Sequence, residues 1–185
     1  MSNNTPLGGR TDRKIVRIED ALQMNGSAER KAYRAALRQA GPKVLLRAVR
    51  GGESEIVSKL LEYGGNPNEA DGYQNSAVHY ASFHGHAEIL QSLLLKGADP
   101  NSINHVGNSP LHLAAENDQP ESTRILLMCG GDPTAVNMNG WSALQTAGHL
   151  GHGRVAHLLG PSADAINRTR LAAAGKTMFL AIDRI

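Results

Sequence analysis

The nine-residue segment Gly107–Ala115 recurs twice more in this chain, each time displaced by 33 residues. The upstream copy is Gln74–Ser82, and the downstream copy is Gly140–Gly148. Each copy has a serine, then a small residue or proline, then an aliphatic residue, and an alanine three positions later. A fixed period of this length is the signature of stacked structural repeats. The chain is therefore expected to fold as an array in which each unit packs against its neighbours.

The central copy predicts how each unit begins. Ser109 suits the N-cap of a short helix, because its hydroxyl can accept a hydrogen bond from an N–H group of the first turn. Pro110 would follow at the first helical position, where its missing N–H costs nothing. Leu111 and either Ala114 or Ala115 are expected to face inward.

A histidine follows the serine in two of the copies, as His79 and His112, whereas the third copy has Gln145. A lone histidine would invite a catalytic or metal-binding interpretation. A histidine that recurs in one register is better explained as a hydrogen-bonding strut between a loop and a helix, and we adopt this interpretation.

A longer, leucine-rich helix is expected after each short one. Apolar residues at helical spacing predict such helices over residues 53–63, 86–96 and 124–129. Each is followed by a glycine, which suits the left-handed C-cap position, and soon afterwards by a proline, which stops the helix. The corresponding turns are Gly64–Asn68, Gly97–Asn101 and Gly130–Thr134.

Together these features resemble the ankyrin repeat family closely over residues 38 to about 160. The motifs that carry the resemblance are Ser109–Ala115, the Gly85-His86 pair before a second helix, and Lys96–Asn101. The resemblance implies an all-α ankyrin-repeat solenoid, in which helix–loop–helix units are joined by β-hairpin-like turns. The chain departs from the family pattern at Asp118, where a glycine is usual, and at Pro120, which is expected to start the second helix of the third repeat.

The repeats also divide the chain into segments. We expect a disordered tail over residues 1–11, an N-terminal helical cap over 12–41, four ankyrin repeats over 42–161, and a C-terminal cap or truncated fifth repeat over 162–185. The approximate bounds of the repeats are 38–70, 71–103, 104–136 and 137–161. Helical caps would cover the apolar faces that the terminal repeats of an array leave without a neighbour.

Composition limits where such a protein works. The single cysteine, Cys129, cannot form an internal disulfide. The chain has no run of 18 apolar residues that could span a membrane, and its first ten residues lack the apolar segment of a secretion signal. These features predict an intracellular protein, cytoplasmic or nuclear, with no membrane span. The charge of the chain favours a protein that is monomeric on its own.

Charge is distributed unevenly along the chain. Residues 1–50 carry 11 Lys/Arg and 4 Asp/Glu, whereas residues 51–136 carry 3 and 11. The basic segment from Arg10 to Arg50 leaves open an alternative function, in which it binds nucleic acid or an anionic surface while the repeats serve as a scaffold. Solvated helix faces are the simpler explanation of these charges.

Groups that could carry chemistry are scarce. His149 and His152 straddle an expected loop between two helices, and Cys129 has no histidine near it in the sequence. Gly175-Lys176-Thr177 lacks the upstream glycine and strand of a phosphate-binding loop. We therefore predict no catalytic residue, no cofactor and no metal. An enzyme whose catalytic residues meet only in space stays a third alternative.

The family resemblance implies a non-enzymatic protein-binding module, such as an adaptor, an assembly subunit or a stoichiometric inhibitor. Ankyrin proteins usually bind a protein partner through the hairpin tips and the exposed face of the first helix. The residues at these positions are Arg50, Tyr73, Asn75, Phe83, His105, Val106, Asn108, Glu116, Met138, Asn139, Trp141 and His149. Three of the chain's seven aromatic residues are among them, and large aromatic side chains carry much of the energy of protein interfaces.

Overall fold

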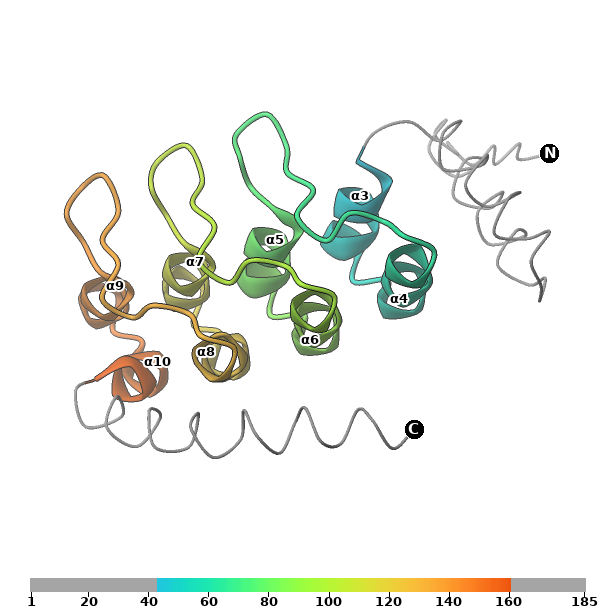
Figure 1. Cartoon of the computed structure of the whole chain (residues 1–185). Helices are drawn as coiled ribbons and strands as arrows, with labels where there is room; N and C mark the ends of the chain where they lie inside the picture. Colours follow the sequence, from blue (N-terminus) through green and yellow to red (C-terminus); the bar gives the residue numbers. More distant parts are fainter. Residues whose placement is uncertain (1–42, 161–185) are drawn as a thin grey trace, which may run out of the picture.

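A computed structural model describes residues 43–160, which contain eight helices (Figure 1). The helices are α3 (Val44–Gly51), α4 (Ser54–Glu62), α5 (Ala77–His84), α6 (Ala87–Leu95), α7 (Pro110–Glu116), α8 (Pro120–Met128), α9 (Ala143–Leu150) and α10 (Gly153–Leu159). The expected tail over 1–11, the N-terminal cap over 12–41 and the C-terminal segment over 162–185 lie outside the described residues.

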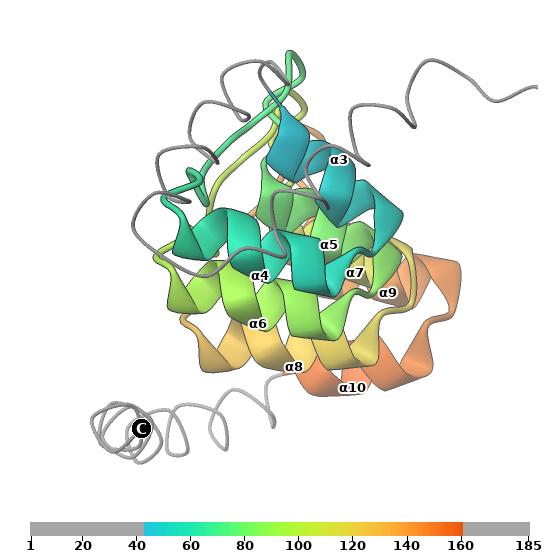
Figure 2. The same cartoon turned by 90° about the vertical axis from the view of Figure 1, so that its right-hand side faces the viewer.

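The eight helices form two rows, as Figures 1 and 2 show. The inner row consists of α3, α5, α7 and α9, and the outer row consists of α4, α6, α8 and α10. Each helix packs against its partner in the other row and against the next helix of its own row. The expected all-α solenoid is therefore confirmed.

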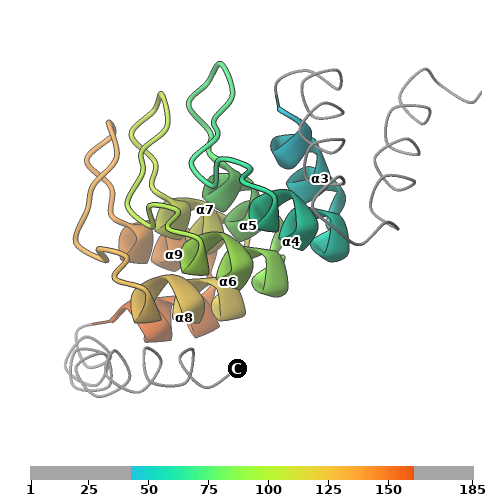
Figure 3. The ribbon, with the colours of Figure 1, turned by 45° about the vertical axis from the view of Figure 1, so that its right-hand side comes forward.

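Three long loops leave the outer row and return to the inner row, and they project to the same side of the solenoid (Figure 3). They join α4 to α5, α6 to α7 and α8 to α9. Isolated antiparallel bridges, Ala70–Ser76 and Val136–Ser142, close two of them at the base. Residues 43–160 contain no strand beyond these bridges, so the loops are hairpin-like, as expected from the sequence.

Apolar side chains fill a continuous core between the two rows. The largest fully buried apolar side chains include Leu60, Ile89, Leu90, Leu93, Leu111 and Leu126. Alanines at one repeat position, Ala81, Ala114 and Ala147, are completely buried, and their small side chains let neighbouring inner helices approach closely. Burying one leucine stabilises the fold by about 1.5–3 kcal/mol, so the leucines of the outer row supply much of the stability.

Serine occupies the N-cap of three inner helices, as predicted. The Ser142 hydroxyl accepts a hydrogen bond from the backbone N–H of Gln145, at 3.3 Å. The hydroxyls of Ser76 and Ser109 also lie 2.8 Å from a histidine nitrogen three residues further on. In all three helices the serine and the residue at the third helical position form a capping box.

Asp118 adopts a left-handed backbone conformation that glycine adopts in the other repeats. Its φ is 48°, whereas Gly52, Gly85 and Gly151, which hold the same repeat position, have φ of 72°, 71° and 76°. A side chain in this region strains the backbone, although aspartate tolerates it better than most residues. The departure from the family pattern at Asp118 is thus a change of residue without a change of turn.

Asparagines join successive repeats at the turns that follow the outer helices. The Asn101 side chain donates to the carbonyl of Gly130 at 2.9 Å and accepts from the backbone N–H of Asp132 at 2.7 Å. Asn68 makes the equivalent pair of bonds to the following turn. These bonds fix the spacing between neighbouring repeats and hence the position of the loops.

Candidate functional site

A buried histidine connects α7 to the loop that precedes α9. Nδ1 of His112 accepts a hydrogen bond from the backbone N–H of Ser109 at 3.1 Å, and its Nε2 lies 2.9 Å from the carbonyl oxygen of Trp141. A carbonyl oxygen can only accept, so Nε2 carries the proton and Nδ1 is the acceptor. The geometry therefore requires a neutral imidazole that spans two repeats.

His79 makes the equivalent bonds one repeat earlier, to the backbone N–H of Ser76 at 3.1 Å and to the carbonyl oxygen of Asn108 at 2.9 Å. Burial lowers the pKa of both His79 and His112 below the ordinary value for histidine. The predicted role of these histidines as struts between helix and loop is confirmed.

These struts make the stability of the array sensitive to acid. Histidines of the unfolded chain titrate near pH 6.5, and the pKa of His79 and His112 lies lower in the folded state. As the pH falls, the unfolded state therefore binds protons first, and the free energy of unfolding is expected to decrease from about pH 7.5 to about pH 5.5. Urea denaturation followed by circular dichroism across this range measures the decrease.

The matched variant for this measurement is His79→Gln/His112→Gln, because Gln145 already occupies the same repeat position. Its free energy of unfolding should depend less on pH over the same range. Asp132 does not interfere, since hydrogen bonds from Thr134 lower the pKa of its carboxyl and place its titration at more acidic pH. An equally steep decrease in the variant would assign the pH dependence to other groups.

Side chains within each loop hold its tip in one conformation. Oδ1 of Asn137 accepts from the backbone N–H groups of Asn139 and Trp141, at 3.0 and 3.1 Å. Asn104 and Asp71 play the same part in the two preceding loops. Each tip is therefore ordered by its own carboxylate or amide before any partner binds.

Further hydrogen bonds connect each loop to the next. The side-chain amide of Asn137 donates to Oδ1 of Asn108 at 2.9 Å, and that of Asn104 donates to Oδ1 of Asn75 at 2.9 Å. At the tips, the backbone N–H of Met138 donates to the carbonyl of Val106 at 3.1 Å. The three loops consequently form one connected surface.

Most of the exposed large apolar side chains lie on these loops or on the inner helices beside them. The structure describes ten of them, and eight lie on the loops or near the C-terminal ends of inner helices: Tyr73, Phe83, Ile103, Val106, Val136, Met138, Trp141 and Leu150. The other two, Leu95 and Met128, end the outer helices α6 and α8. We call the surface formed by the three loops and the C-terminal ends of the inner helices the loop face.

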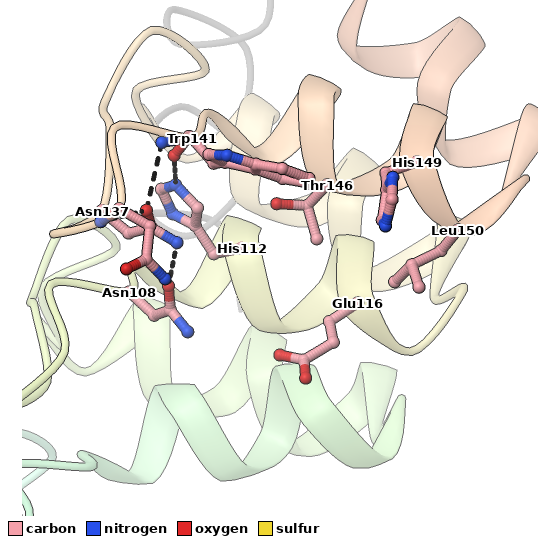
Figure 4. A pocket seen from close by; sticks show the side chains of 9 residues that line it. Asn108, His112, Glu116, Asn137, Trp141, Thr146, His149 and Leu150 are labelled. Atoms are coloured by element: carbon pink, nitrogen blue, oxygen red, sulfur yellow. Dashed lines mark hydrogen bonds between the residues drawn. The ribbon is translucent and has the colours of Figure 1, made fainter.

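A hollow of about 440 Å³ lies on the loop face between α7 and α9 (Figure 4). Five residues that the sequence predicts to bind a partner line it: Asn108, Glu116, Asn139, Trp141 and His149. His112, Asn137, Thr146 and Leu150 complete the lining. The indole of Trp141 makes an edge-to-face contact with the His149 ring, with ring centroids 5.0 Å apart.

The other predicted residues lie outside this hollow. They are Arg50, Tyr73, Asn75, Phe83, His105, Val106 and Met138. Tyr73 and His105 contact each other at neighbouring loop tips, with ring centroids 5.9 Å apart. Asn75 uses its side-chain oxygen to hold the next loop, so its role is at least partly structural. A part in partner binding stays a prediction for all of these residues.

Sequence reasoning did not select three exposed apolar residues of the loop face, Ile103, Val136 and Leu150. Ile103 and Val136 occupy the same position of successive repeats, and their exposed fractions are 60% and 58%. An aliphatic residue that recurs at a loop position without entering the core is a feature that the sequence could have revealed.

The N-terminal end of the loop face has a different character. The guanidinium of Arg50 lies over the Tyr80 ring, 5.1 Å from its centroid, and the Tyr80 hydroxyl donates to Asp71 at 2.6 Å. A second hollow of about 230 Å³ lies here, and Lys43, Arg47 and Arg50 contribute to its lining. The described part of the loop face is therefore basic at the end near α3, whereas Glu116 and Trp141 lie toward its other end.

Three observations bear on other kinds of site. No group of three His, Cys, Asp or Glu side chains within residues 43–160 is arranged to hold a metal ion. Among the same residues, no helix is both long enough and apolar enough to cross a membrane. Burial raises the pKa of the Cys129 thiol, which disfavours the reactive thiolate.

The stacked helix pairs and bonded loops define a solenoid repeat protein. The family model for ankyrin repeats in three copies matches residues 21–104 and 81–170. These matches span most of the chain, which therefore belongs to the ankyrin repeat family. A comparison with curated proteins found no match. Ankyrin repeats are generally protein–protein interaction modules and are typically not enzymes.

Proposed function

We propose that this protein is a non-enzymatic binding module that holds a protein partner on the loop face. The observation that carries the proposal is the concentration of exposed apolar side chains there, eight of the ten in residues 43–160. Exposed apolar groups that gather on one surface are typical of protein interaction sites.

The hydrogen bonds of the loops support the same function. Because side chains such as Asn104 and Asn137 already order the loops, a partner would not have to immobilise them on binding. Pre-organisation of this kind reduces the entropic cost of association. An adaptor, an assembly subunit or a stoichiometric inhibitor would all use such a surface.

The experiment is affinity capture from native lysate with the wild type and with Trp141→Ala and Phe83→Ala variants. Both residues are 39% exposed on the loop face, and each substitution is expected to weaken binding of the captured protein by more than about 1 kcal/mol. Trp141 should have the larger effect because it also lines the hollow. Thermal unfolding of each variant shows that the fold is retained.

The matched controls are Leu95→Ala and Met128→Ala, which remove exposed apolar side chains from the outer row. These variants should capture the partner as the wild type does. Equal losses in controls and loop-face variants would contradict the proposal. If none of the four substitutions changes capture, but nuclease or high salt abolishes it, the function would be assigned to the basic segment from Arg10 to Arg50.

A further inference from the structure

We propose that the hollow between α7 and α9 binds an arginine side chain of the partner protein, which stacks on Trp141 and pairs with Glu116. The inference rests on the proposed function, because it specifies what the loop face recognises. It depends on an aromatic ring from the loop before α9 and a carboxylate from the end of α7, which line the same hollow (Figure 4).

The position of Trp141 is fixed without a partner. Its carbonyl oxygen accepts from His112, its backbone N–H donates to Asn137, and its ring makes a T-shaped contact with His149. The residue nevertheless stays 39% exposed at the hollow. A fixed and accessible indole is the best aromatic surface for a cation, because its ring face is electron-rich.

Glu116 supplies the charge. It is exposed at the end of α7, and the ion pairs of the described residues, Glu55–Lys59 and Glu121–Arg124, do not involve it. Among residues 43–160, Glu116 is the only Asp, Glu, Lys or Arg whose side chain lines the hollow. Burial keeps His112 neutral at physiological pH by lowering its pKa, so this histidine does not offset the carboxylate.

Arginine satisfies this combination better than lysine. Its planar guanidinium can stack on an aromatic ring and can present two N–H groups to a carboxylate, whereas an ammonium group acts as a point charge. The uncharged polar groups of Asn139 and Thr146 also line the hollow and can accept further N–H bonds. Residues 43–160 carry 7 Lys/Arg and 11 Asp/Glu, so their net charge also attracts a basic segment.

Selection from a phage-displayed library of random peptides tests the inference on the full-length protein. Peptides selected on the wild type are expected to share an arginine at one position. For such a peptide, replacing that arginine by citrulline, which has a similar shape and no charge, should weaken binding about ten-fold. The same replacement should cost less than about two-fold on the Glu116→Gln variant, because the carboxylate that distinguishes the two side chains is gone.

Asp118→Asn is the control for general electrostatic attraction, because it removes an exposed carboxylate close to α7 that does not line the hollow. This variant should retain the full preference for arginine over citrulline. Trp141 is the only tryptophan of the chain, so its fluorescence should change when the arginine peptide binds to wild type. It should change far less with the citrulline peptide at the same concentration.

The outcomes separate the two proposals. Selected peptides that need Trp141 but lack a common arginine would overturn this inference and leave the proposed function intact. A preference for arginine that persists in Glu116→Gln would also overturn it. Failure to select any peptide whose binding depends on the loop face would contradict both.

Discussion

Replacing His112 by alanine is expected to lower the free energy of unfolding by about 3 kcal/mol. The imidazole is 2% exposed and bonds to the backbone of both Ser109 and Trp141. Alanine would leave a buried N–H and a carbonyl oxygen without partners and would open a cavity. Urea denaturation followed by circular dichroism measures the loss.

His112→Gln is the informative companion variant. Gln145 shows that glutamine at this repeat position still accepts from the backbone N–H of its capping serine, at 2.8 Å. Glutamine should therefore preserve the cap, lose the bond to Trp141 and cost less than alanine. Because Trp141 lies beyond the broken bond, its fluorescence should report unfolding of that region at a lower urea concentration than circular dichroism does. Equal stability of the alanine variant and the wild type would show that the strut contributes nothing.

Replacing Gly107 by alanine is expected to lower the free energy of unfolding by about 2–3 kcal/mol. Gly107 has a φ of 74°, which strains any residue with a Cβ atom. A Cβ atom there would also lie 2.9 Å from the backbone nitrogen of Met138 in the next loop. That nitrogen donates to Val106, so it cannot move away without breaking a bond between loops.

Gly140→Ala separates the two causes. Gly140 holds the same position one repeat later, with a φ of 75°, but a Cβ atom there would meet nothing within 4 Å. This variant should lose only the conformational part, about 1 kcal/mol. Thermal and urea unfolding of both variants make the comparison. Equal losses would mean that the contact with Met138 relaxes easily.

Much of the fold could be predicted from the sequence because the repeat period fixes equivalent positions. Serine, proline and leucine at 109–111 correctly indicated the start of α7. Each outer helix ends within one residue of the end that its following turn predicted. The strut role of His112 followed from its recurrence as His79. Pro120 is the first residue of α8, as expected, although the apolar spacing marked only the later part of this helix because the first turn, Pro120-Glu121-Ser122-Thr123, lacks leucines.

The candidate site was less predictable. A period identifies the residues that are free of the core, and it placed Glu116, Trp141 and His149 on the same list. It does not reveal that residues from α7, α9 and two loops enclose one hollow, since this depends on the stacking distance and on the direction of each side chain. Leu150 was missed for a related reason, because a leucine at helical spacing ordinarily indicates the core.

The side-chain bonds between repeats also determine how such a chain can change in length. Those of His79, Asn68, Asn101 and His112 join residues 29 to 31 positions apart, so each partner lies in the adjacent unit. If a gene duplication inserted one more 33-residue unit, every new junction would present the same donors and acceptors as the old ones. The loop face would gain one loop, with positions equivalent to Glu116 and Trp141 open to new side chains. The number of repeats, and with it the binding surface, can thus change while the hydrogen bonds that join the repeats stay the same.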